Sequence, residues 1–252
     1  HGAPDPAGPR TKGRIDVMLE PSTLVLFDID GTILLTAGAG RRALRAALAT
    51  EVGPACDFEG VRFDGKTDPQ IVVELLETAG HPGAADADFV RGLCRRYIGL
   101  LAEELNHPRT QTTLMPGVLD LLDELERDQG ILLGLLTGNM AEGAALKLAA
   151  AGIAPDRFRV GAYGSDSPHR PDLPRIAARR AMAHFGREPR GRQVVIIGDT
   201  PADVTCGRAI AARAIGVATG AYPIDALADA GAHATFLDLR DTARVLEAIR
   251  GE

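Results

Sequence analysis

LVLFDIDGT, residues 24–32, joins a run of four apolar residues to two carboxylates, Asp28 and Asp30. The apolar run predicts a strand buried on both faces, as in a parallel sheet. Two acids at the tip of such a strand lose hydration, which costs free energy unless a cation, a proton or hydrogen-bond donors compensate. Doubly wound sheets bind their ligands at this end of the strands. Taken alone, the two aspartates could also cap a turn.

From residue 116 onward, apolar runs typical of strands alternate with helical patterns. The predicted strands are 131–136, 159–162, 194–197, 214–217 and 235–237, and the predicted helices are 118–128, 141–151, 172–185, 202–211 and 241–250. Strands separated by helices favour right-handed crossovers within a parallel sheet. We therefore predict an α/β fold with a doubly wound, mostly parallel, Rossmann-like sheet.

Residues 37–114 carry helical patterns and no convincing strand, which predicts an inserted α-helical domain. Its expected helices are 38–50, 68–79 and 86–106, the second with Asp68 as N-cap and Gly80 as its stop. The chain then divides into a flexible N-terminal extension (1–17), a Rossmann-like core (18–36 and 115–252) and the helical insertion (37–114).

Composition and charge exclude several classes of partner. The chain of 252 residues is 45% hydrophobic, carries a net charge of −6 and contains no tryptophan. It offers neither the basic surface nor the aromatic platform that nucleic acids require. No apolar run approaches the roughly 20 residues that span a bilayer. Three widely spaced cysteines fit a reducing compartment. We expect a cytoplasmic monomer or homodimer without a nucleic-acid or membrane partner.

Chemically suggestive residues follow two more of the predicted strands. Thr137, Gly138 and Asn139 follow strand 131–136, and Asp199 follows strand 194–197, with Asp203 four residues later. The carboxyl ends of parallel strands share one edge of the sheet, so these groups are expected to meet Asp28 and Asp30 there. Oxygen ligands with few protein donors suit Mg²⁺ better than zinc. Asp199 and Asp203 could instead serve as helix-capping acids.

Together these segments resemble the signature motifs of the haloacid dehalogenase-like (HAD) hydrolase superfamily: DIDGT at 28–32, TGN at 137–139 and GDTPAD at 198–203. The resemblance extends from about residue 19 to the end of the chain. The helical insertion is similar to the cap of phosphoglycolate-phosphatase-like members.

The resemblance implies a role for each acid. Asp28 would be the nucleophile that attacks phosphorus and gives an aspartyl-phosphate. Asp30 would protonate the leaving alkoxide and later deprotonate the attacking water. Mg²⁺ would be held by Asp28, Asp199, the carbonyl of Asp30 and, through water, Asp203.

Other motif residues are expected to bind the substrate. By the same resemblance, the Thr137 hydroxyl and the Gly138 amide would bind the transferring phosphoryl oxygens. Gly31, Thr32 and Asn139 are expected beside them. In the cap, FDGKTD at 63–68 is the loop expected to face the substrate. There Gly65 gives flexibility, and Lys66 is either a ligand for a substrate carboxylate or phosphate, or a solvated side chain.

The sequence departs from the family pattern at one catalytic position, since the family's usual lysine is absent. No lysine follows Lys147, which we place on the solvated face of a helix. Arg170, just before a predicted helix, is the best replacement, because a guanidinium can bind phosphoryl oxygens with two donors. Arg175 is the alternative.

The resemblance favours a Mg²⁺-dependent phosphatase that acts on a small phosphorylated metabolite. A phosphotransferase similar to β-phosphoglucomutase keeps both acids and remains the main alternative. A dehalogenase or a phosphonate hydrolase lacks the second acid, so Asp30 argues against both. A non-catalytic binding module on the same fold is the remaining hypothesis.

Overall fold

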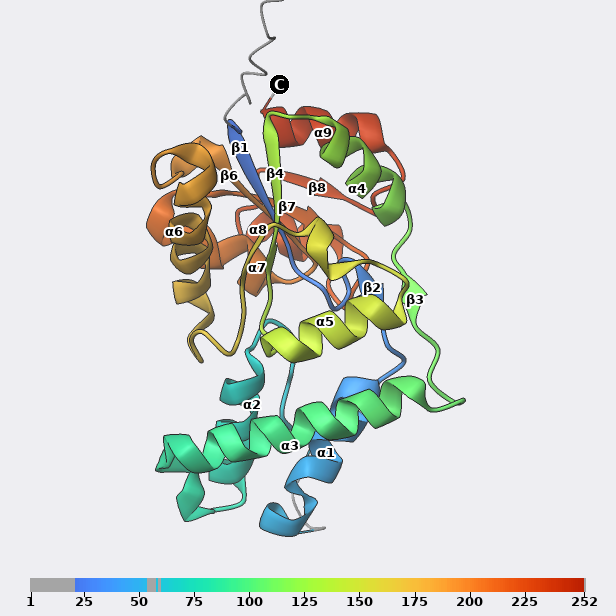
Figure 1. The fold of residues 1–252 in the computed structure, drawn as a ribbon, viewed down its shortest axis with the longest axis vertical. Coiled ribbons are helices and arrows are strands. Elements are labelled where there is room, and N and C mark those ends of the chain that lie inside the picture. Colours follow the sequence, from blue (N-terminus) through green and yellow to red (C-terminus); the bar gives the residue numbers. More distant parts are fainter. Residues whose placement is uncertain (1–20, 54–57, 59, 252) are drawn as a thin grey trace, which may run out of the picture.

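A six-stranded parallel sheet forms the centre of the computed structural model, which describes residues 21–53, 58 and 60–251 (Figure 1). Its strands are β1 (Thr23–Phe27), β4 (Ile131–Leu136), β5 (Val160–Ala162), β6 (Val194–Gly198), β7 (Arg213–Val217) and β8 (Ala234–Phe236), in the order β5-β4-β1-β6-β7-β8. Phe27 at the end of β1 pairs with Leu135 of β4 and Ile197 of β6. The predicted α/β fold is therefore confirmed.

Helices cover both faces of the sheet and bury its apolar side chains. On one face lie α4 (Val118–Arg127), α5 (Ala141–Ala150) and α9 (Thr242–Arg250). On the other face lie α6 (Leu173–Phe185) and α7 (Pro201–Cys206). Alternate residues of β1 enter the two layers: Val25 and Phe27 face the first, Leu24 and Leu26 the second. Burial on both faces explains why β1 reads as an unbroken apolar run.

Three helices between β1 and β4 form a separate apolar cluster, which we call the cap. They are α1 (Ala39–Val52), α2 (Asp68–Thr78) and α3 (Ala87–Asn106). Figure 1 shows the cap below the carboxyl ends of the strands. The chain enters the cap through β2 (Leu34–Leu35) and leaves it through β3 (Thr113–Leu114), which pair as a short antiparallel ribbon. The cap therefore covers the edge of the sheet where the motif residues are found.

Several local features differ from the sequence-based expectations. Helix α2 has Thr67 as its N-cap, one residue before the predicted Asp68, because the Thr67 hydroxyl accepts a hydrogen bond from the amide of Gln70. The predicted helix 202–211 ends as α-helix at Cys206 and continues as a 3-10 turn, Gly207–Ile210. Strands β2 and β3 and helix α8 (Ile224–Asp229) were not predicted, because each is too short to show a period. The predicted extension 1–17 lies outside the described residues.

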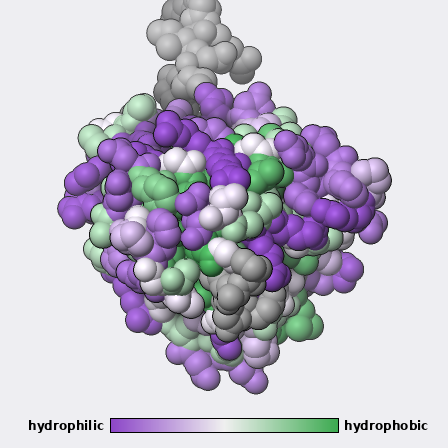
Figure 2. Space-filling model, turned by 90° about the horizontal axis from the view of Figure 1, so that it is seen from below, coloured by the Kyte–Doolittle hydropathy of each residue, from purple (hydrophilic) through white to green (hydrophobic). Residues whose placement is uncertain are grey.

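Figure 2 views the cap end of the molecule and shows hydrophobic residues scattered among hydrophilic ones. Within the described part of the chain, no helix combines the length and the apolar character needed to cross a membrane.

Candidate active site

Three neighbouring strands end side by side at the edge of the sheet that the cap covers. Asp28 follows β1, Thr137 follows β4 and Asp199 follows β6, and β1 lies between the other two strands. Asp203 joins them from the first turn of α7. Its carboxylate accepts hydrogen bonds from the amide and the hydroxyl of Thr200, at 3.0 and 2.7 Å, so the start of the helix fixes its orientation. The parallel topology thus brings residues about 170 positions apart to one place.

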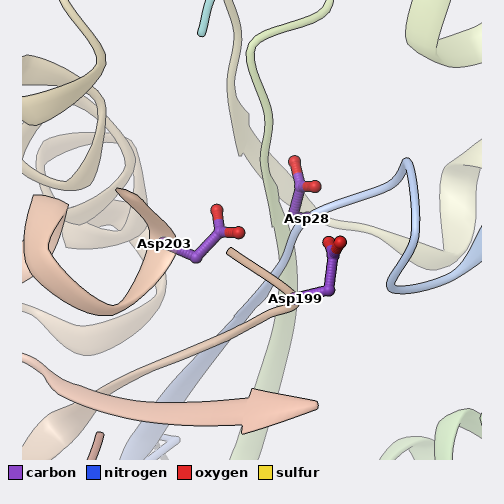
Figure 3. A group of neighbouring side chains, drawn as sticks. All are labelled: Asp28, Asp199 and Asp203. Carbon is purple, nitrogen blue, oxygen red and sulfur yellow. The ribbon is translucent and has the colours of Figure 1, made fainter. Parts of the chain in front are cut away.

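Asp28, Asp199 and Asp203 form a compact acidic cluster. One carboxylate oxygen from each lies within 4.8 Å of the other two, and Figure 3 shows the three side chains around one small space. Glycines make the close wall around Asp199: a Cβ on Gly31 would lie 2.4 Å from its Oδ2, and a Cβ on Gly220 would lie 1.8 Å away. Three buried carboxylates in this arrangement fit a hard divalent cation such as Mg²⁺.

Burial and mutual repulsion oppose ionisation in this cluster. Burial, followed by the charge of Asp203, raises the pKa of Asp28 to about 7 although Arg170 opposes the change. Burial, followed by the charges of Asp203 and Asp28, raises the pKa of Asp199 to about 9. A bound cation would favour the ionised carboxylates and relieve the repulsion between them.

Arg170 is the buried cation beside the proposed nucleophile. It begins the 3-10 turn Arg170–Asp172 that precedes α6, and its Nη2 lies 3.1 Å from Asp28 Oδ1 and also contacts Asp203. Burial disfavours the charged guanidinium, but Asp203 and Asp28 outweigh burial and hold the pKa of Arg170 above its usual value. Its Nε is buried without a hydrogen-bond partner among the described residues. Arg175 is exposed on α6.

Lys147 corrects one sequence-based expectation, because it is buried rather than solvated. Its Nζ donates to both oxygens of Asp30, at 2.8 and 2.6 Å, and to Oδ1 of Asn139 at 2.6 Å. Asn139 in turn donates to Asp30 Oδ2 at 2.8 Å. The carboxylate of Asp30 is thus held by three hydrogen bonds from two side chains.

Two donors of the segment after β4 are available to a ligand. Asn139 Nδ2 donates to the Thr137 hydroxyl oxygen at 2.7 Å, which leaves the hydroxyl proton of Thr137 free to turn elsewhere. The amide of Gly138 donates to no group within the described residues. Both residues line the cavity below the sheet. They can donate to oxygens of an anion placed beside Asp28.

The cap loop 63–68 contacts the core directly. The amide of Asp68 donates to the Gly138 carbonyl at 2.7 Å, and its carboxylate accepts from the amide of Met140 at 2.8 Å. The Thr67 hydroxyl donates to the Pro168 carbonyl at 2.7 Å. Burial raises the pKa of Asp68 to about 6, although Lys147 lowers it. These contacts hold the cap closed against the segment that carries Thr137 and Gly138.

A cavity of about 250 Å³ lies between the core and the cap. Its core wall includes Asp28 and Asp30, and its cap wall includes Phe63, Ile71 and Tyr97. This volume suits a small metabolite. The polar core wall and the partly apolar cap wall suit a molecule with one strongly charged end.

The remaining predicted residues divide into two groups. Gly65 and Lys66 line the cavity, and Lys66 forms an ion pair with Glu74 of α2. Gly31 and Thr32 do not line it, contrary to the expectation that they contact the substrate. Thr32 is buried and donates to Asp199 Oδ1 at 3.0 Å, so it orients an acid of the cluster instead.

Sequence reasoning missed Lys147 and the two cap anchors, Thr67 and Asp68. A signal for Lys147 was present in the helical period: Gly143, Ala144, Lys147 and Leu148 form the buried face of α5. A lysine on such a face requires a buried acceptor. Nothing in the local sequence indicates that the segment 67–68 bonds to residues after β4, because the contact depends on how the cap lies on the core.

Comparisons with known proteins agree with this geometry. The family model for haloacid dehalogenase-like hydrolases matches residues 25–208. A comparison with curated protein sequences gave no significant match. Among solved structures, a hydrolase from Pseudomonas syringae superposes with a TM-score of 0.66 at 22% identity, covering 90% of this chain and 98% of that one.

Two further structures are similar in fold. A predicted phosphoglycolate phosphatase from Haemophilus somnus gives a TM-score of 0.65 at 21% identity, covering 91% of this chain and 99% of that one. A variant of CbbY from Rhodobacter sphaeroides, in complex with xylulose-(1,5)bisphosphate, gives 0.68 at 21% identity, covering 86% and 95%. These likenesses support the fold, whereas the family model matches most of the sequence and includes all three motifs. The chain belongs to the haloacid dehalogenase-like hydrolase family.

Proposed function

We propose that this protein is a Mg²⁺-dependent phosphatase that hydrolyses a small phosphomonoester through an aspartyl-phosphate on Asp28. The observation that carries the proposal is that the two acids, Asp28 and Asp30, line one capped cavity together with Thr137 and Gly138, which can donate hydrogen bonds to phosphoryl oxygens. The structural neighbours described as a predicted phosphoglycolate phosphatase and as CbbY in complex with a sugar bisphosphate agree with a phosphorylated substrate.

The first half-reaction uses both acids of the β1 tip. A carboxylate oxygen of Asp28 forms a bond to phosphorus while the bond from phosphorus to the leaving oxygen breaks. Asp30 gives its proton to the leaving alkoxide, which departs as an alcohol. Asp30 suits this role because its side chain is partly exposed and lines the cavity.

The second half-reaction reverses the role of Asp30. Its carboxylate takes a proton from water, the water oxygen bonds to phosphorus, and the bond to Asp28 breaks to release phosphate. The closed cap limits entry of bulk water while the leaving group is present.

Charge on the transferring phosphoryl group is balanced by fixed donors. Arg170 lies beside Asp28, and the Thr137 hydroxyl and Gly138 amide have protons free for phosphoryl oxygens. Mg²⁺ bound by Asp28, Asp199 and Asp203 would screen the carboxylates from the anionic substrate and polarise the phosphoryl group.

A panel of small phosphomonoesters (phosphoglycolate, sugar phosphates and nucleoside monophosphates) tests the proposal, with phosphate release measured in Mg²⁺ and in chelator. We expect Mg²⁺-dependent release by the wild type and none by Asp28→Asn. Asp229→Asn, which changes an exposed acid on α8, is the matched control and should match the wild type. An isomerised sugar phosphate without free phosphate would identify a phosphotransferase. Binding without turnover by the wild type would exclude a phosphatase and indicate a binding module.

A further inference from the structure

Each of the two acids at the tip of β1 has its own buried cation. Arg170 contacts Asp28, whereas Lys147 contacts Asp30. The two pairs come from different elements: Arg170 precedes α6, and Lys147 lies in the interior of α5. The proposed phosphatase chemistry uses Arg170 beside the phosphoryl group and leaves Lys147 without a role.

The burial of Lys147 calls for an explanation. Its side chain is 5% exposed, and burying an ammonium group costs several kcal/mol unless good partners compensate. All three of its protons are committed, two to the oxygens of Asp30 and one to Asn139. The same helix position filled by leucine would bury apolar surface without any such cost. The arrangement therefore favours a role for the ammonium group in holding Asp30.

The cap contributes to the surroundings of this ion pair. A Cβ added to Gly40 of α1 would lie 3.7 Å from Lys147 Nζ and 3.5 Å from the hydroxyl of Tyr97 of α3. Helix α1 of the cap therefore lies close to the ammonium group. Because charged hydrogen bonds are stronger where water is excluded, the closed cap strengthens the hold of Lys147 on Asp30.

We propose that Lys147 is a positioning residue that holds the carboxylate of Asp30 toward the leaving-group side of the cavity. The inference rests on the proposed phosphatase function. When Asp30 gives its proton to the leaving alkoxide, the carboxylate that remains accepts two hydrogen bonds from Lys147 and one from Asn139. The same bonds hold that carboxylate in place when it accepts a proton from water. Lys147 itself neither gains nor loses a proton.

The nature of the leaving group separates this role from a purely structural one. An alkoxide needs a proton as it departs, whereas p-nitrophenolate is stable without one. In Lys147→Met, single-turnover release of the alcohol should fall about 100-fold. The substrate for this measurement is phosphoglycolate, or the alkyl phosphate of the panel that is turned over fastest. Release of p-nitrophenolate from p-nitrophenyl phosphate should change far less. Arg179→Met, on the exposed side of α6, is the control and should leave both rates unchanged.

A double variant tests whether Lys147 acts through Asp30. Lys147→Met added to Asp30→Asn should slow alcohol release little beyond Asp30→Asn alone, because the acid that Lys147 positions is already gone. The double variant also removes both charges, so it leaves no buried charge without a partner and is protected against misfolding.

If Lys147→Met itself does not fold, Lys147→Arg provides the test. It keeps the charge but moves the donors, and it should show the same selective loss of alcohol release.

Two results would overturn the inference. Equal slowing of both substrates by Lys147→Met or Lys147→Arg would indicate a structural role only, and unchanged alcohol release would indicate no role. Failure of the phosphatase proposal is recognised separately, because the wild type would then release no phosphate from any compound of the panel.

Discussion

Arg170 is the side chain that we propose in place of the family's usual lysine. The guanidinium lies between Asp28 and Asp203, so one side chain contacts both the proposed nucleophile and another acid of the carboxylate cluster. A lysine has a single charged atom and no planar fork, so it could not place several donors in fixed directions. The replacement is therefore a change in geometry as well as in residue type.

Arg170→Met should lower turnover by about 10²- to 10³-fold, because it removes the cation beside Asp28 that we propose to stabilise the phosphoryl group. Arg170→Lys keeps the charge and should be affected less. Steady-state phosphate release measures both. Arg175→Met is the control: this side chain is exposed and should be dispensable. The opposite pattern, with activity lost only in Arg175→Met, would reverse the assignment.

At the scale of single residues, the sequence predicts the position of site residues that follow a strand better than that of site residues on the face of a helix. Asp28, Thr137 and Asp199 could be placed together because an apolar run marks each strand, and parallel strands end at one edge. The placement of Lys147 on a solvated helix face was wrong, because a lysine in a helix is usually solvated and its acceptor lies 117 residues away in sequence. Thr32 was assigned to the substrate because it belongs to the motif, whereas its hydroxyl supports Asp199.

At the scale of elements, the cap loop packs tightly against the turn after β4. Gly138 is the tightest point: a Cβ there would lie 1.9 Å from the Lys66 carbonyl oxygen and 2.9 Å from Thr67 Cα. Both contacts are with backbone atoms, which cannot rotate away. The closed cap therefore requires glycine at this position.

Gly138→Ala should keep the fold but prevent full closure of the cap. Overpacking costs about 1–3 kcal/mol, which corresponds to roughly a tenfold to hundredfold loss of the closed state. We expect turnover to fall by that factor while circular dichroism stays unchanged. Gly99→Ala is the matched control, because nothing lies within 4 Å of a Cβ at this exposed position of α3. It should stabilise the protein by about 1 kcal/mol without loss of activity. Full activity in Gly138→Ala would contradict a closed cap as the working state.

The sequence also predicts the long elements better than their connections. Helices α1 and α3 and strands β1, β4 and β6 were predicted within a few residues, because each carries a clear apolar period. The ribbon of β2 and β3 was not predicted, because two residues per strand give no pattern and the two strands lie on either side of the cap in the sequence. The manner in which α2 meets the core is likewise a tertiary property.

At the scale of the whole molecule, we expect the acidic cluster to make the free energy of unfolding depend on pH and on Mg²⁺. Burial and neighbouring acids raise the pKa of Asp199 to about 9 and that of Asp28 to about 7, whereas an unfolded aspartate titrates at about 3.9. Between these values the folded protein holds protons that the unfolded chain has released. The free energy of unfolding of the metal-free protein therefore decreases as pH rises from about 4 to about 9.

The thermal unfolding midpoint of the chelator-treated protein should fall as the pH rises from about 4 to about 9. Mg²⁺ should raise the midpoint most at the alkaline end of this range, because the carboxylates there bind the ion without first losing protons. Asp199→Asn removes the acid whose pKa burial and the neighbouring acids raise to about 9. Its midpoint should vary less with pH and respond weakly to Mg²⁺, whereas Asp229→Asn, an exposed acid, should behave as the wild type. A midpoint of the metal-free wild type that rises with pH over this range would mean that the cluster is not the dominant titrating group. An unchanged response of Asp199→Asn to Mg²⁺ would place the cation elsewhere.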